Sequence, residues 1–74
     1  MAINKTTQQA LSDKAGRPGM TIQQSLNVLA GTTGLTAQNA ANVYAGTVGM
    51  SIQNALNTKV GRVGLTIQDA ANLL

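Results

Sequence analysis

Reactive side chains are scarce in this sequence of 74 residues. It contains no His, no Cys and no Glu, so Asp13 and Asp69 are its only acidic side chains. Acid–base and nucleophilic catalysis both need an activating group beside the reactive one. The two aspartates occupy different positions of the repeat described below, which disfavours a shared site. We therefore expect no enzyme activity, no cofactor and no metal site, and disulfides are excluded.

A Gly-x-x-Gly motif recurs and is the other pattern with known binding chemistry. Such a loop can bind phosphate when a helix N-terminus and a suitably placed Lys follow it. No Walker-type Lys-Ser/Thr pair follows any copy, and recurrence in successive units favours a turn. We predict that the first glycine of each pair ends a helix in the left-handed conformation and that the second redirects the chain. The first glycines are Gly16, Gly31, Gly46 and Gly61, and the second are Gly19, Gly34, Gly49 and Gly64.

These glycines mark an internal repeat with a period of 15 residues. The text recurs as GRPGMTIQQSLNVLA, GTTGLTAQNAANVYA, GTVGMSIQNALNTKV and GRVGLTIQDAANLL. We interpret the chain as one repeat domain, 1–74, made of units 1–15, 16–30, 31–45, 46–60 and 61–74. The first unit is degenerate, because Met1 and Asn4 replace its glycines.

Each unit predicts one short helix of about ten residues followed by a turn. A hydroxyl residue stands where a helix N-cap belongs, and its side chain can accept from a backbone N–H of the first turn. The five predicted N-caps are Thr6, Thr21, Thr36, Ser51 and Thr66. Gln9 and Gln24 complete strict capping boxes in the first two helices. Apolar residues such as Ile22, Leu26 and Leu29 form one stripe at helical spacing.

A helix this short is not stable alone in water, so each must bury its stripe against its neighbours. The expected fold is all-α, a short solenoid of five single-helix repeats. It should be about 40–50 Å long if successive helices stack at 8–10 Å. A two-layer zigzag and a continuous spiral both satisfy the pattern.

Amide side chains recur at two positions four residues apart, on one helix face. The first set is Gln8, Gln23, Gln38, Gln53 and Gln68, and the second is Asn27, Asn42, Asn57 and Asn72, with Ser12 in the first unit. One interpretation is structural, with amides that pair with each other or satisfy carbonyls of the turns. The other is a polar strip that docks on a protein lattice.

The net charge of +3 reflects a shortage of acids rather than many bases. Five cations and the single aromatic residue Tyr44 are a weak basis for nucleic-acid binding, which we do not expect. Lys14 and Arg17 flank one turn, and Lys59 and Arg62 flank another at the same repeat positions. These pairs are either a solvated edge or two contacts to an acidic partner surface.

No apolar run has the length of a signal peptide or of a membrane span, so we expect neither a cleaved signal nor a membrane partner. A chain this short is marginally stable alone, which points to a partner subunit or self-association. The last unit suggests where. Ile67, Leu73 and Leu74 would face an absent sixth helix, so we predict that this face docks on another copy of the chain or on another protein subunit. In the alternative, Leu73 and Leu74 fold back and complete the core.

At the level of the repeat text, G-T-T-G-L-T-x-Q-x-A-A-N-x-x-A-G resembles repeats in virion structural proteins of tailed bacteriophages, especially phages of actinobacteria. The resemblance covers residues 16–74 well and 1–15 loosely. It implies a virion location after synthesis in the host cytoplasm, and a small head decoration or minor capsid protein that binds capsid subunits. The alternatives are a minor tail or head–tail connector component and a free helical-repeat adaptor.

Overall fold

The computed structural model describes residues 5–74, and within that range all regular structure is helical. Five helices follow one another along the chain: α1 (Thr7–Ala15), α2 (Ile22–Ala30), α3 (Ala37–Ala45), α4 (Ile52–Val60) and α5 (Ile67–Leu73). The predicted all-α class and the five single-helix units are therefore confirmed. Met1 and Asn4, where the first unit departs from the repeat, lie outside the described residues.

The helices begin where a hydroxyl side chain satisfies a free backbone N–H. The N-cap residues are Thr6, Thr21, Thr36, Ser51 and Thr66. In α2 the backbone N–H of Gln24 donates to Thr21 Oγ1 at 3.1 Å, and Gln24 Oε1 accepts from the Thr21 backbone N–H at 3.3 Å. This reciprocal capping box is present in α1 and α2, whose third helical residue is Gln.

The first four helices end at a glycine in the left-handed conformation. Gly46, for example, has φ 76° and donates its N–H to carbonyls of the last turn of α3. The next N–H, from Thr47, donates to Asn42 O at 2.9 Å. These two bonds satisfy carbonyls that a helix end otherwise leaves free. The second glycine of each turn also has positive φ, as at Gly49 with 73°.

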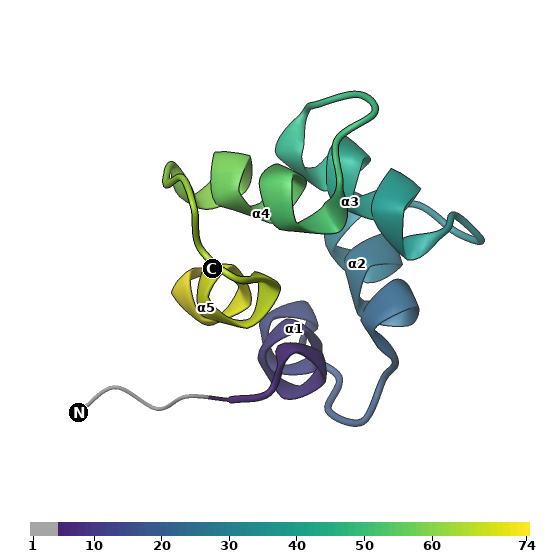
Figure 1. Ribbon diagram of the computed structural model, residues 1–74. Helices are drawn as coiled ribbons and strands as arrows, with labels where there is room; N and C mark the ends of the chain where they lie inside the picture. The colour runs from purple at the N-terminus through teal and green to yellow at the C-terminus, as the bar shows by residue number, and fades with distance from the viewer. Residues whose placement is uncertain (1–4) are drawn as a thin grey trace.

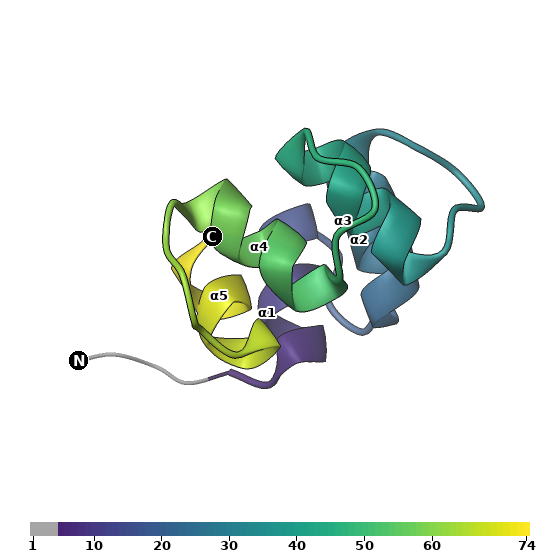
Figure 2. The ribbon, with the colours of Figure 1, turned by 45° about the horizontal axis from the view of Figure 1, so that its top comes forward.

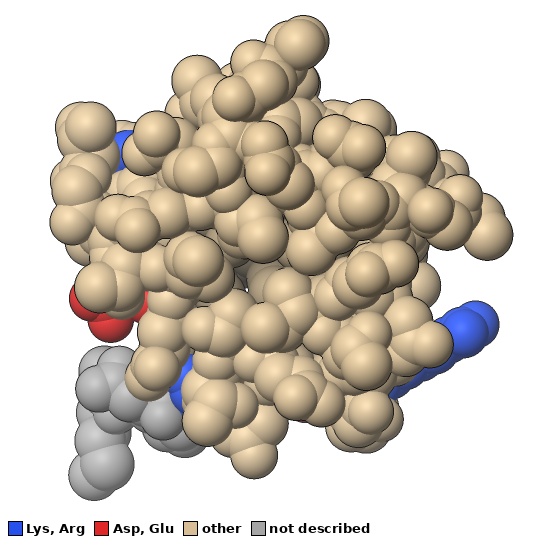
Figure 3. Space-filling model, turned by 45° about the vertical axis from the view of Figure 1, so that its right-hand side comes forward, with Lys and Arg blue, Asp and Glu red and all other residues tan. Residues whose placement is uncertain are grey.

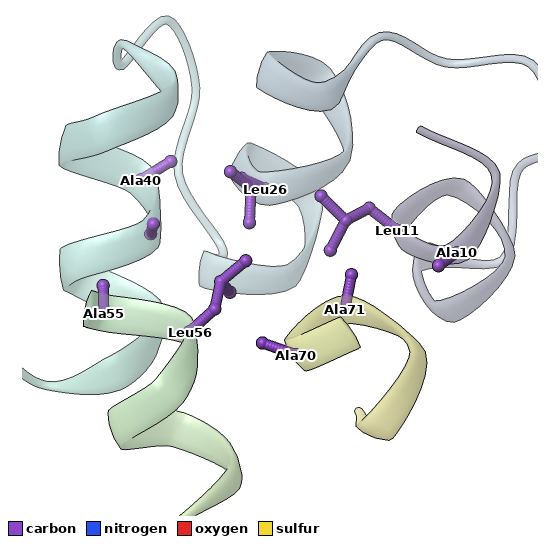
Figure 4. Close-up of a cluster of buried hydrophobic side chains, with 9 residues drawn as sticks. Ala10, Leu11, Leu26, Ala40, Ala55, Leu56, Ala70 and Ala71 are labelled. Atoms are coloured by element: carbon purple, nitrogen blue, oxygen red, sulfur yellow. The ribbon is translucent and has the colours of Figure 1, made fainter. Parts of the chain in front are cut away.

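The core is formed by one repeat position, whose side chain faces the middle of the molecule in each helix. Leu11, Leu26 and Leu56 are fully buried there, and Ala41 and Ala71 fill the equivalent positions of α3 and α5. Figure 4 shows the three leucines converging from different helices. A ring of small residues surrounds them: Ala10, Ser25, Ala40, Ala55 and Ala70. Small side chains at the helix contacts let the backbones approach closely.

The five helices close into a ring, and this corrects the expected open solenoid. Each helix packs on the next along the chain, and α1 also packs on α5 (Figure 1). The Cα atoms extend 33 × 27 × 13 Å, a flat body rather than a rod 40–50 Å long. Turning the view shows the five helices around the same centre (Figure 2). Identical junctions that rotate the chain with little rise bring the fifth helix back to the first.

Ring closure also changes the predicted environment of the C-terminal face. The face that would receive a sixth helix receives α1. Leu74 is partly buried against the core, as is Ile67, while Leu73 is 50% exposed. The expectation that the C-terminal face is open was therefore wrong, because α1 covers it. The alternative, that Leu73 and Leu74 both complete the core, was wrong for Leu73.

Candidate interaction surface

The recurring asparagines are buried clamps that join each helix to the turn that follows it. Asn42 donates from Nδ2 to Gln38 O at 2.8 Å and to Met50 O at 2.8 Å. Its Oδ1 accepts from the Met50 backbone N–H at 3.0 Å and from Thr47 Oγ1 at 2.8 Å. One side chain thereby holds its own helix, the turn and the start of the next helix. Asn27 and Asn57 make the same bonds to Leu35 and Leu65.

The glutamines do not pair side chain to side chain with these asparagines. The Asn amide reaches the backbone carbonyl of the Gln four residues earlier, and the Gln side chains at all five positions are exposed. The two parts of the predicted polar strip therefore separate. The asparagines have the structural role that one interpretation gave them, and the glutamines are left on the surface.

Two positions vary the clamp. Ser12 takes the asparagine position in α1, donates to Met20 O at 2.9 Å, and lies 3.2 Å from Ser25 Oγ. Asn72 in α5 has no turn after it within the described chain and bonds to Lys5 instead. Its Nδ2 donates to Lys5 O at 2.9 Å, and the Lys5 backbone N–H donates to its Oδ1 at 3.0 Å. Lys5 thus takes the place that Met50 has for Asn42.

Exposed apolar side chains gather on the turns and on the outward helix faces. Val48 and Val63 are each 95% exposed, and each lies between the two glycines of its turn. These turns, 46–51 and 61–66, lie at the two ends of α4. Val28, Val43 and Leu73 are 44–51% exposed and share one repeat position on the outer side of α2, α3 and α5. The apolar surface is therefore concentrated on the turns that flank α4 and on the outer rim.

The cations do not combine into one basic patch. Lys5 forms an ion pair with Asp13, and Lys59 Nζ lies 4.6 Å from the centre of the Tyr44 ring. Burial raises the pKa of the Tyr44 hydroxyl. Lys14 borders a hollow between α1 and α5, whereas Arg17 borders a different one between the first two turns. On the face in Figure 3, blue side chains stand apart at the margin.

The Lys14–Arg17 pair flanks the end of α1, and the Lys59–Arg62 pair flanks the end of α4. Lys14, Arg17, Lys59 and Arg62 are all exposed. Among the helices of residues 5–74, none has the length and the apolar sequence that a membrane span needs. The two hollows are open and shallow. This geometry offers broad contact surfaces of mixed polarity rather than a cleft that would surround a small molecule.

Comparison with known proteins gives no match. No protein-family model matches the chain, no curated protein is similar to it, and no solved structure resembles it. The properties of the surface therefore have to be argued from its own residues.

Sequence reasoning did not single out Val48 and Val63. The sequence did contain a signal, because this turn position changes from Pro18 and Thr33 in the first two turns to valine in the last two. An apolar β-branched residue between two turn glycines has no helix or strand to join, so it must project into solvent. That two successive turns carry such a residue distinguishes this part of the ring from the rest.

Proposed function

We propose that the chain is a structural protein of a bacteriophage virion, a small head decoration or minor capsid protein that binds other virion subunits. The repeat text supports this class by its resemblance to virion proteins. The ring supports a role in protein–protein contact, because Asn clamps and glycine turns join its helices into one body with broad, open surfaces.

The observation that carries the proposal is the pair Val48 and Val63. Both side chains are almost fully exposed, at the tips of the turns on either side of α4. Each turn is held by an Asn clamp and positive-φ glycines, so the valines project from ordered backbone. Little side-chain or backbone entropy is then lost when the valines are buried by a partner. Rigid exposed apolar groups of this kind are typical anchors of an interface.

The test is binding to purified virions. Mass spectrometry of particles from an infected host should find the chain at many copies per head. Added protein should bind particles that lack it, and Val48→Asp with Val63→Asp should reduce that binding by at least about tenfold. Thr33→Asp, at the equivalent position of another turn, is the matched control and should bind like the unmodified chain.

The same experiment separates the alternatives. A few copies that remain with isolated tails would replace the head assignment by a tail or connector role. Absence from particles, with no binding of the added protein, would overturn the virion proposal in favour of a free adaptor. Unchanged binding of the double-valine variant would show that another surface makes the contact.

A further inference from the structure

The junction between α1 and α5 is the one place where the described ring is held without a connecting turn. Every other neighbouring pair of helices is joined by a turn with two positive-φ glycines. At the α1–α5 junction the Asn72–Lys5 bonds join residues 67 positions apart in sequence. We call this junction the seam, defined by Lys5 and Ala10 on one side and by Asn72 and Leu74 on the other.

Two residues at the seam are more exposed than their equivalents at the other junctions. Ala10 is 6% exposed, whereas Ala40, Ala55 and Ala70, which have the same repeat position, are fully buried. Asn72 is only partly buried, while Asn42 and its equivalents are buried. An open hollow of about 410 Å³ lies along the seam, bordered by Lys5, Asn72 and Leu74. With no connecting turn and with these residues partly exposed, the seam can open without breaking any turn of the chain.

The two sides of the seam are different and complementary surfaces. The α5 side presents the amide of Asn72, and the α1 side presents the backbone N–H and C=O of Lys5, which that amide binds. No turn obliges the two sides to belong to one chain. An interface of this type, in which unlike surfaces meet head to tail, can form within one molecule or between two.

We propose that the seam also forms between two copies of this chain, so that α5 of one copy binds α1 of the next. The new contact repeats the Asn72–Lys5 bonds, and a small change of rotation and rise at the other junctions separates α1 from α5 of the same chain. Closure within one chain has an effective concentration on the order of millimolar, so the closed ring prevails in dilute solution. Head-to-tail oligomers form as the local concentration approaches that value. This inference does not depend on the proposed virion role.

A complementation experiment tests it directly. Ala10→Glu places a charge in the α1 side of the seam and leaves the α5 side intact. Asn72→Ala with Leu74→Glu damages the α5 side and leaves the α1 side intact. Neither variant can close its own ring, but a mixture has one good surface of each kind. Light scattering after size exclusion should give a 1:1 complex for the mixture and monomers for each variant alone. A mixture that stays monomeric, with helical circular dichroism in both variants, overturns the proposal.

The unmodified chain gives a second measurement that does not depend on how those variants fold. It is refolded from denaturant at micromolar and at about millimolar concentration. The oligomer fraction should be at least about tenfold larger at the higher concentration and should decay on dilution. Monomer at both concentrations overturns the proposal.

A ring that cannot open is the matched control for this measurement. In it, Leu74 is joined to residue 1 through one added Ala, with Met1→Gly and Asn4→Gly. This places Lys5 eight residues after Asn72, the separation between Asn57 and Leu65 in a natural turn. The cyclised chain should stay monomeric when refolded at millimolar concentration. If it oligomerises as much as the linear chain, the contact uses the outer surface and the seam is not involved.

Discussion

Asn72 binds Lys5 through the same pair of hydrogen bonds that Asn42 makes to Met50. The amide donates to a carbonyl and accepts from the N–H of the same residue, at 2.9 and 3.0 Å for Lys5 and at 2.8 and 3.0 Å for Met50. Met50 follows Asn42 by eight residues, whereas Lys5 and Asn72 are 67 residues apart. The first unit thus occupies the place of a sixth one, and the chain behaves as a five-membered cycle.

The clamp predicts an unequal response of two amides in one helix. Asn42→Ala leaves the partly buried Met50 N–H and C=O without their partner, so the free energy of unfolding should fall by about 1–3 kcal/mol. Gln38→Ala, at an exposed position four residues earlier, should change it by less than about 0.5 kcal/mol. Urea unfolding followed by circular dichroism measures both. Equal values would contradict the clamp.

The turn glycines predict a backbone penalty with no steric part. Gly31 has φ 73°, and a Cβ added there would meet no atom within 4 Å. Gly31→Ala should therefore cost about 1–2 kcal/mol, the strain of an L-residue in the left-handed conformation. Thr33→Ala is the control and should be nearly neutral. Thr32 is unsuitable as a control, because its hydroxyl donates to Asn27 Oδ1. A Gly31→Ala variant as stable as Thr33→Ala would argue against the left-handed turn.

The Ser12–Ser25 contact predicts a stabilising double substitution. The Ser12 hydroxyl donates to Met20 O but does not accept from the Met20 N–H, and Ser25 stands where other helices have Ala. Ser12→Asn together with Ser25→Ala gives this junction the residues of the others. The substitutions replace three side-chain hydrogen bonds by the three that Asn57 makes, but they give the Met20 N–H an acceptor and replace a buried hydroxyl by a methyl group, so Tm should rise by up to about 4 °C. Differential scanning calorimetry measures the shift. A lower Tm would mean that the serine pair is the better solution for this site.

Ring closure predicts that new chain ends are tolerated in a turn. A permuted chain starts at Gly34 and joins Leu74 to residue 1 through one added Ala, with Met1→Gly and Asn4→Gly. It should keep the helicity and the cooperative unfolding of the original, because every helix keeps its neighbours. The same permutant without the added Ala is one residue short in the new turn and should be clearly less stable. Loss of helicity in both permutants would contradict the α1–α5 contact.

Tyr44 predicts a loss of stability in alkaline solution. Burial raises the pKa of its hydroxyl in the folded chain above the value in the unfolded chain. The unfolded chain therefore loses the proton first as pH rises, and stability that is complete below the unfolded pKa falls until the folded pKa is passed. Phenolate absorbance should titrate at higher pH in the folded than in the denatured protein. Tyr44→Phe should remove this contribution, and identical titrations in both states would refute it.

Much of the local structure could be predicted from sequence, because local structure depends on residues close together in the chain. Thr21 and Gln24 specify a capping box by type and spacing, and Gly31 specifies a helix end by its freedom to adopt positive φ. The course of the chain over one repeat is thus readable. The bonding partners of Asn27 could be predicted only in part. Its amide donates to the backbone carbonyls of Gln23 and Leu35, and every residue has a backbone carbonyl, so the side-chain pattern does not show which ones it binds.

Ring closure could not be read in the same way. An open coil and a closed ring of the same units differ by a small rotation and rise at each junction, and the apolar stripe is identical in both. Lys5 shares a repeat position with Met20 and Leu35, yet its side chain gives no sign that its backbone binds Asn72. The exposure of Val48 follows from local sequence, whereas the partial burial of Leu74 follows from where α1 lies.

A closed cycle also constrains how such a gene can change. In an open array, recombination between similar 15-residue segments adds or removes a unit and leaves every remaining contact intact. Here a sixth unit would separate Asn72 from Lys5. If the fourth unit were deleted, Asn42 would bind the unit that then follows it, but the remaining four helices would not close the ring. The closed ring therefore fixes the number of units, whereas an open array would tolerate more or fewer of them.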